Sequence, residues 1–291
     1  FLTPLVVVLA SDVVDGLSFM KMSATTTATT SASIKTFAAP IAHVTAAPAI
    51  VELATKTSTI TRTWEPMAAQ EIVNRFNSVT DGQEEQRPFM VALVGIPGSG
   101  KSTSCDLVVE ELSTKYGFEN VLVMPHDGYH YTKEELKAMD DPDDLIYRRG
   151  APETFDAKAL LHDLKRIRDG QEDTVCVPGF DHAKGDPEPD EHTFERSQHP
   201  IVVCEGLYLL HEGDGWDEIP DQFDFRIFID SDLDLCIDRV KIRNKCIPGY
   251  TEEEIEVRAD LVDRVNALTV HESVSRADLV VDSALATPKI R

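Results

Sequence analysis

The sequence predicts an α/β fold built around one phosphate-binding loop, and three adjacent features carry that prediction. Residues 89–94 are apolar throughout, as expected of a buried strand. The next residues, Gly95-Ile-Pro-Gly-Ser-Gly-Lys-Ser102, match the pattern G-x-x-x-x-G-K-[ST]. Over residues 102–116, apolar side chains recur at helical spacing, and Gly117 supplies a helix stop. Strand, glycine loop and helix in this order are the context that the motif requires.

The chemistry of this loop follows from its residue types. Glycines allow backbone N–H groups to turn towards phosphate oxygens, and the N-terminus of the next helix adds a partial positive charge. Lys101 is expected to neutralise the β- and γ-phosphates, and the Ser102 hydroxyl to bind Mg²⁺. A glycine turn with an unrelated lysine is the alternative, but the flanking strand and helix favour a nucleoside triphosphate site. The residues expected to line this site are Gly95, Pro97, Gly98, Ser99, Gly100, Lys101, Ser102 and Thr103.

Composition and charge limit what else the chain can be. With 291 residues, 42% of them hydrophobic, it can bury one sizeable α/β core. A formal net charge of −23 argues against DNA or RNA as a partner, because binding a polyanion requires a broad basic surface. The five cysteines include no C-x-x-C pair, so we expect buried thiols in a reducing compartment rather than disulfides or a zinc site.

Residues 1–63 do not have the sequence pattern of a folded domain. Residues 1–10 are apolar but too short to span a membrane, and no membrane segment is predicted elsewhere. Residues 23–63 are rich in Ser, Thr and Ala with Glu52 as the only acid, a composition typical of organelle transit peptides; a flexible tail is the equal alternative. We expect a targeting or disordered segment over 1–63 and a folded domain over 64–291. The location would be a plastid or mitochondrion if the segment is a transit peptide, and the cytoplasm otherwise.

An acidic side chain follows the second predicted strand. Residues 121–125 form a short apolar run that leads into His126-Asp-Gly-Tyr-His130. The carboxyl ends of parallel strands face the ligand crevice, so Asp127 is expected beside the phosphates, where it can accept the proton of an attacking hydroxyl. Asp127 could instead cap the helix that follows. A metal site made of His126, Asp127 and His130 is disfavoured, and Tyr129 and His130 are expected to contact substrate.

A pair of arginines occupies the next loop. Arg148 and Arg149 precede a helix expected over residues 156–169, in a loop that contains Gly and Pro. Their guanidinium groups are placed to bind phosphate or substrate oxygens. Alternatively, they are exposed and balance the acidic turn at residues 140–144.

A strand expected over residues 174–178 opens into a second loop. Residues 179–187 are too rich in turn residues to predict regular structure, and residues 186–199 are interpreted in part as an acidic connection. Loops at strand ends often carry specificity. The side chains expected to contact substrate here are Phe180, Asp181, His182 and Lys184.

Two further features complete the expected site. Residues 201–206 form an apolar strand that ends at Glu205, whose carboxylate is expected to support Mg²⁺ together with Ser102; capping of a turn is the alternative. A helix over residues 232–245 carries Arg239, Lys241 and Arg243, which could close over the nucleotide as a lid or form a solvated face. The remaining expected elements are a helix at 65–79, a strand at 225–230, a helix at 252–271 and a strand at 277–282.

Five motifs together resemble the superfamily of uridine kinase, phosphoribulokinase and pantothenate kinase. They are residues 95–102, Asp127-Gly-Tyr-His130, Arg149-Gly-Ala-Pro-Glu-Thr-Phe-Asp156, Pro178-Gly-Phe-Asp-His182 and Glu205-Gly-Leu-Tyr-Leu-Leu210. The similarity is greatest to the pantothenate-kinase-like, or fructose-transport-kinase-like, branch and runs from about Phe89 to the end. It implies a P-loop NTPase fold of three α/β/α layers, with a parallel five-stranded sheet and a helical lid. It also implies MgATP, Asp127 as catalytic base, Glu205 near the metal, and Arg239 and Arg243 as lid arginines.

The resemblance leaves the acceptor open, because the loop after Asp181 does not match the base-binding segment of uridine kinases and no phosphoribulokinase substrate pattern is found. We expect a kinase that transfers the γ-phosphoryl group of MgATP to a hydroxyl of a nucleoside, sugar or pantothenate-like small molecule, with a homodimer left open. The alternative is a nucleotide-dependent switch with slow hydrolysis. Its GTP-binding form would require an N-K-x-D motif, and the nearest string, Asn244-Lys-Cys-Ile247, lacks the Asp.

Overall fold

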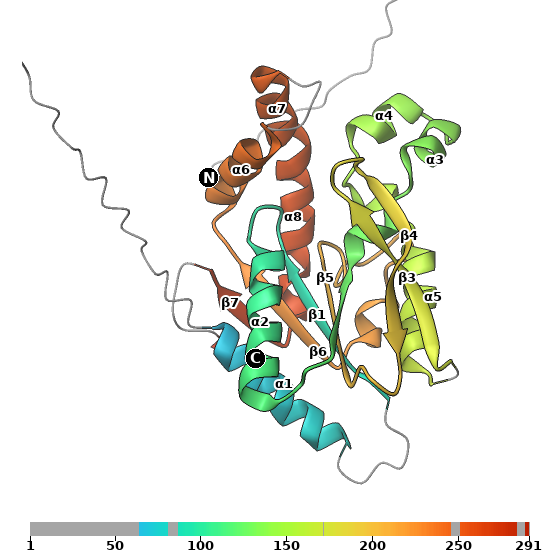
Figure 1. Cartoon of the computed structure of the whole chain (residues 1–291). Coiled ribbons are helices and arrows are strands. Elements are labelled where there is room, and N and C mark those ends of the chain that lie inside the picture. Colours follow the sequence, from blue (N-terminus) through green and yellow to red (C-terminus); the bar gives the residue numbers. More distant parts are fainter. Residues whose placement is uncertain (1–63, 81–86, 171, 246–250, 284–288, 291) are drawn as a thin grey trace, which may run out of the picture. The chain divides into compact units, whose positions relative to one another are not determined.

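The computed structural model describes residues 64–80, 87–170, 172–245, 251–283 and 289–290. The segment expected to be a targeting or disordered region, residues 1–63, lies outside the described residues. Within the described part, six strands form one sheet, and other elements cover both of its faces (Figure 1). No helix in this part combines the length and the apolar character that a membrane span requires.

The strands of the described residues are β1 Phe89–Gly95, β2 Val121–Pro125, β3 Thr174–Asp181, β4 Asp186–Glu195, β5 Ile201–Gly206, β6 Phe225–Asp230, β7 Leu279–Asp282 and β8 Lys289–Ile290. Five of them form a parallel sheet in the order β2-β5-β1-β6-β7, and β8 adds a short antiparallel strand at the β7 edge. The predicted parallel five-stranded sheet is therefore confirmed. Its inner strands are apolar almost throughout because both faces are buried.

The helices of the described residues are α1 Glu65–Thr80, α2 Lys101–Tyr116, α3 Lys133–Ala138, α4 Pro142–Tyr147, α5 Ala157–Arg168, α6 Leu233–Asn244, α7 Glu252–Arg258 and α8 Arg264–Glu272. Shorter turns are the 3-10 turns η1 His126–Tyr129, η2 Pro152–Thr154, η3 Pro220–Gln222 and η5 Ser273–Arg276, and the π-turn η4 Ala259–Asp263. The helix expected over residues 252–271 is present as α7, η4 and α8, which follow one another without a gap, so η4 is a π-turn within one helix.

Alternating side chains of β1 divide the core between the two faces of the sheet. Phe89, Val91 and Leu93 pack with α1 and α2 on one face. Met90 and Val94 point to the other face, where α5, α8 and the β3–β4 hairpin contribute the opposing side chains. Helices therefore lie on both sides of the sheet (Figure 1), which is the predicted three-layer α/β/α arrangement.

Several helices begin where a polar side chain caps them. The Asp156 carboxylate accepts the backbone N–H of Ala159 at 2.9 Å at the start of α5. At the start of α6, the Asp232 carboxylate accepts the N–H of Leu235 at 2.8 Å. Such caps satisfy N–H groups that have no partner inside the helix, so they fix the first residue of each helix.

The polar stretch that begins at residue 179 differs from the sequence-based expectation. Residues 179–187 and the acidic connection that follows were predicted to lack regular structure, and that prediction is wrong for most of them, because β3 continues to Asp181 and β4 pairs with it antiparallel. The hairpin forms a separate two-stranded sheet, so the outward side chains of β4 stay solvated while Phe194 is fully buried. Acidic residues and prolines are tolerated on such an exposed edge, which is why composition alone did not reveal the strand.

One ion pair fixes the entry to β1. Asp224, just before β6, accepts two hydrogen bonds from the Arg87 guanidinium, at 2.7 and 2.6 Å, and a third at 2.9 Å from the backbone N–H of Met90. Because Met90 is completely buried, its N–H has no access to water if the carboxylate is removed. The pair therefore holds the start of β1 against β6.

We expect Asp224→Ala to lower the free energy of unfolding by about 1–3 kcal/mol, because it leaves a buried donor unpaired. Urea unfolding followed by circular dichroism measures the change. Glu71→Ala is the matched control, since it removes an i,i+4 pair with Arg75 on a helix surface and should cost about 0.5 kcal/mol. Equal effects of the two substitutions would contradict the role assigned to Asp224.

Candidate active site

The glycine loop lies between β1 and α2 and adopts a backbone conformation that glycine alone adopts readily. Gly98 and Gly100 have φ values of +81° and +90°. A Cβ atom on Gly98 would lie 2.3 Å from the carbonyl oxygen of Cys236, so α6 packs directly against the loop. Helix α2 begins at Lys101, immediately after the loop, and its N-terminal N–H groups therefore face the same space. This is a cradle for an anion.

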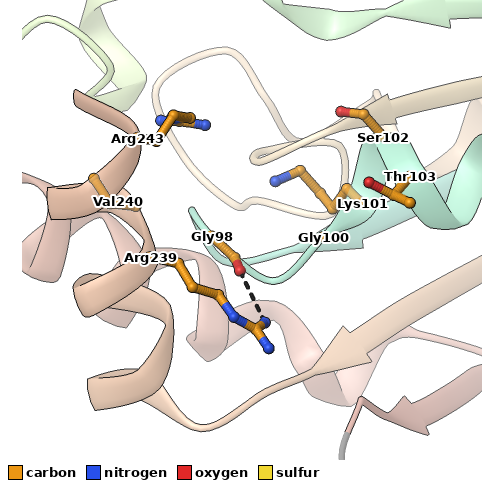
Figure 2. Close-up of a pocket in the computed structure, with 8 residues that line it drawn as sticks. All are labelled: Gly98, Gly100, Lys101, Ser102, Thr103, Arg239, Val240 and Arg243. Atoms are coloured by element: carbon orange, nitrogen blue, oxygen red, sulfur yellow. Dashed lines mark hydrogen bonds between the residues drawn. The ribbon is translucent and has the colours of Figure 1, made fainter. Parts of the chain in front are cut away.

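A cavity of about 270 Å³ lies over this loop (Figure 2). Loop residues line one side, and α6 contributes the other. Burial lowers the pKa of Lys101, while the nearby carboxylates of Glu205 and Asp127 raise it in part. The Lys101 ammonium also donates to the carbonyl oxygen of Ile96 at 3.4 Å. The residues that line the cavity are Gly98, Gly100, Lys101, Ser102, Thr103, Arg239, Val240 and Arg243.

Strand register places Glu205 at the centre of the site. In β5, Glu205 pairs with Leu93 of β1 and with Pro125 of β2, so it lies between the strand that enters the glycine loop and the strand that leads to Asp127. The Ser102 hydroxyl donates a hydrogen bond to the Glu205 carboxylate at 3.0 Å. Burial raises the pKa of Glu205, and the charge of Lys101 opposes that shift.

These oxygen atoms fit a magnesium site. Mg²⁺ is usually bound in proteins by one or two carboxylates and hydroxyls, with water and substrate phosphates completing the shell. Glu205 and Ser102 supply that donor set beside the phosphate cradle. Within the described residues, no group of three or more His, Cys, Asp or Glu side chains is arranged to hold a metal ion.

Asp127 lies on η1, directly after β2, with 42% of its side chain exposed. Burial alone would raise the pKa of its carboxyl group. The neighbouring His126, His130 and Lys101 lower that pKa by a larger amount, so the net shift is downward. The group is therefore ionised at neutral pH and able to accept a proton from a bound hydroxyl.

Two arginines of α6 face the glycine loop across the cavity (Figure 2). Arg239 donates to the carbonyl oxygen of Gly98 at 3.3 Å. Arg243 lines the same cavity one helical turn further on, and its charge contributes to lowering the pKa of Lys101. The third basic residue of the helix, Lys241, does not line the cavity and pairs with Asp260 at 2.9 Å.

Aromatic rings form a row beside Asp127. The His130 ring lies 3.8 Å from the Phe155 ring and 5.1 Å from the Phe180 ring, and His182 follows at 5.2 Å from Phe180. The ring nitrogen Nδ1 of His130 lies 2.8 Å from the backbone oxygen of Asp127. The structure thus brings together His130, Phe180 and His182, three of the residues predicted to contact substrate.

Other residues predicted to contact substrate have internal partners. Tyr129 is buried and donates its hydroxyl to Asp163 on α5 at 2.9 Å. Arg148 pairs with Asp144 at 2.6 Å and with Glu153. These pairs agree with the alternative interpretation, in which the arginine balances the acidic turn at residues 140–144.

Arg149 and Asp181 hold the hairpin. Arg149 donates to the Tyr131 carbonyl oxygen at 2.9 Å, to Asp186 at 2.8 Å and to the carbonyl oxygen of Gly185. The Asp181 carboxylate accepts the backbone N–H groups of Ala183 and Lys184, so it closes the hairpin turn. The contacts of both residues are therefore within the protein.

Sequence reasoning did not select Val240 or Asp263. Val240 lines the cavity from the buried side of α6, a position that looks like ordinary core in the sequence. Asp263 ends η4 and pairs with Arg258 at 3.3 Å; burial raises its pKa, and the charges of Arg258 and Arg243 oppose the shift. A π-turn has no sequence pattern that could have revealed its position, although such turns are frequent at functional sites.

The environment of His130 predicts a pH dependence of stability. Burial lowers the pKa of His130 from its ordinary value near 6.5 to about 4. Between these values the unfolded chain binds a proton that the folded chain does not, so the free energy of unfolding falls as the pH drops from about 6.5 to about 4. His130→Phe, which keeps an aromatic ring, should reduce that slope in urea unfolding experiments across this range. An unchanged slope would show that His130 titrates normally.

Comparisons with known proteins agree with this geometry. The family model described as "Phosphoribulokinase / Uridine kinase family" matches residues 90–288. A Schizosaccharomyces pombe protein provisionally named as a uridine kinase is 33% identical over 211 residues, which cover 71% of this chain and 88% of the relative. The pantothenate kinase of Pasteurella multocida is 28% identical, with 78% of this chain and 77% of the relative covered.

A solved structure extends the similarity to three dimensions. The crystal structure of a protein from Silicibacter sp. TM1040, provisionally named as a fructose transport system kinase, has a TM-score of 0.64 at 27% identity and covers 75% of this chain and 98% of its own. The glycine loop, the five parallel strands and the family match lead to one conclusion. The chain belongs to the phosphoribulokinase/uridine kinase family of nucleotide-binding P-loop kinases.

Proposed function

We propose that this protein transfers the γ-phosphoryl group of MgATP to a hydroxyl of a small acceptor. One observation carries the proposal: Lys101, the Ser102–Glu205 pair and Asp127 meet at the carboxyl ends of β1, β5 and β2. A cation at the phosphate cradle, a magnesium donor pair and an ionised carboxylate are the groups that phosphoryl transfer to an alcohol requires.

In the proposed reaction, Asp127 accepts the proton of the acceptor hydroxyl. That oxygen forms a bond to the γ-phosphorus as the bond to the β,γ-bridging oxygen breaks, and ADP leaves with the electron pair. Lys101 and the loop N–H groups hold the phosphates in line for this displacement. Arg239 and Arg243, which face the loop from α6, neutralise charge on the transferred group. Mg²⁺ held by Ser102 and Glu205 would supply further charge neutralisation.

The acceptor class follows from the chemistry of the base and from the names of relatives. Asp127 requires a hydroxyl that enters along the row of His130, Phe180 and His182. Relatives are named for uridine and pantothenate, and a similar structure is named for fructose transport. We therefore propose a nucleoside, a sugar or a pantothenate-like molecule.

Acceptor-dependent ADP release tests the proposal. The full chain is incubated with MgATP and with uridine, cytidine, fructose, D-glycerate or pantothenate, and ADP is measured by a coupled assay. One acceptor should stimulate release, and Asp127→Asn should lower that rate by about 10²–10⁴-fold because proton abstraction is lost. Asp230→Asn is the matched control, since Asp230 also ends a parallel strand but pairs with His271 and lies outside the cavity lining.

The switch alternative makes the opposite prediction. Equal ADP release with and without every acceptor, unchanged by Asp127→Asn, would favour a nucleotide-dependent switch and exclude Asp127 as the base.

A second test concerns the nucleotide cradle. Gly98→Ala should weaken ATP binding at least tenfold, because the new Cβ would lie 2.3 Å from the Cys236 carbonyl oxygen. Gly117→Ala is the matched control: its φ of +77° imposes the same backbone strain, yet no described atom lies within 4 Å of the added Cβ. Isothermal titration calorimetry with ATP compares the two. Similar affinities in both variants would show that the close approach of α6 does not shape the site.

A further inference from the structure

His126 is a buried polar side chain next to the proposed catalytic base. It is fully buried, and neither of its ring nitrogens has a hydrogen-bond partner among the described residues. A neutral imidazole always carries one N–H donor, and buried donors without a partner are rare in folded proteins. Nothing in the reaction proposed above uses this group, so its orphaned donor requires an explanation.

The ring has little freedom to move. A Cβ on Gly206 would lie 2.3 Å from the Cβ of His126 and 2.7 Å from its Cγ, so β5 approaches the histidine as closely as glycine permits. The ring stacks on Phe155 at 4.2 Å, and the rings of Trp216 and Tyr208 lie 5.5 and 6.0 Å away. Packing therefore fixes the direction in which each nitrogen points.

One of these nitrogens faces the base. Nδ1 of His126 lies 3.8 Å from Oδ1 of Asp127, about 1 Å beyond hydrogen-bond distance. The carboxylate belongs to a side chain that is 42% exposed, whereas the ring is enclosed. Rotation of the carboxylate alone can therefore close the gap, and the histidine can act as a fixed reference.

We infer that His126 is a positioning residue: as the neutral Nδ1–H tautomer it donates a hydrogen bond to the Asp127 carboxylate and holds it towards the acceptor hydroxyl. This inference rests on the proposed function, in which Asp127 is the base. The hydrogen bond occupies one carboxylate oxygen and leaves the other to receive the substrate proton. The orphaned donor is then satisfied in the catalytically competent arrangement.

Three substitutions separate positioning from packing. In His126→Asn the amide nitrogen takes the place of Nδ1, in His126→Gln it takes the place of Nε2, and His126→Phe fills the space without a donor. With the acceptor that supports turnover in the wild-type chain, His126→Asn should keep kcat within about threefold. His126→Gln and His126→Phe should lose about 10- to 100-fold in kcat, with KM for MgATP unchanged, because the base is misplaced. Thermal unfolding checks that each variant is folded.

Nuclear magnetic resonance provides a readout that does not depend on an acceptor. In the full chain labelled with ¹⁵N-histidine, the signal of His126 is the one that disappears in His126→Asn. We expect the neutral Nδ1–H tautomer at pH 7, and a shift of the tautomer equilibrium towards Nε2–H in Asp127→Ala.

The tautomer of His126 and the kcat values of its variants each test the inference. An Nε2–H tautomer in the wild-type chain, a tautomer unaffected by Asp127→Ala, or equal kcat losses in His126→Asn and His126→Phe would overturn the inference. If no acceptor of the panel stimulates ADP release, the proposed function fails, while the tautomer still decides whether the hydrogen bond exists.

Discussion

The parallel pairing of β5 with both β1 and β2 is the constraint on which the site depends. Because Glu205 lies opposite Leu93 and Pro125, the ends of three strands reach the same edge of the sheet at the same level. The glycine loop follows one strand, Asp127 follows another, and Glu205 itself ends the third. A shift of β5 by one residue would turn Glu205 to the opposite face of the sheet, away from Ser102.

Close backbone contacts then set the distances between these groups. Gly98 allows α6 to rest on the glycine loop, and Gly206 allows the end of β5 to rest on His126. The first contact brings Arg239 and Arg243 to the cavity, and the second encloses the residue beside the base. In both places the absence of a side chain is what permits the approach.

The side chains that line the cavity carry positive charge, although the chain as a whole is strongly negative. The chain carries a formal net charge of −23, yet the cavity is lined by Lys101, Arg239 and Arg243. Two carboxylates, Asp127 and Glu205, act on Lys101 from nearby and partly compensate its burial. A local positive pocket in an acidic protein suits a small polyanion such as a nucleotide and not an extended one such as nucleic acid.

Local sequence determined most of the fold and the nucleotide side of the site. Apolar runs predicted the inner strands, because both faces of a parallel sheet are buried. The glycine motif predicted the phosphate cradle, because the spacing of its glycines reflects the backbone geometry of the loop. Strand β4 and its pairing with β3 were missed because an exposed edge strand needs few apolar residues, here mainly Phe194.

Only the tertiary structure showed which of the side chains expected to contact substrate have partners within the protein. Tyr129 and Arg149 have residue types suited to a substrate, but their hydrogen bonds go to Asp163 and Asp186, partners that lie far away in the sequence. Arg148 instead pairs with Asp144, four residues before it. The orphaned nitrogens of His126 are likewise visible only once the surrounding rings are in place. Residue type states what a side chain can do, whereas its partners, which folding brings together from distant positions, decide what remains free to do it.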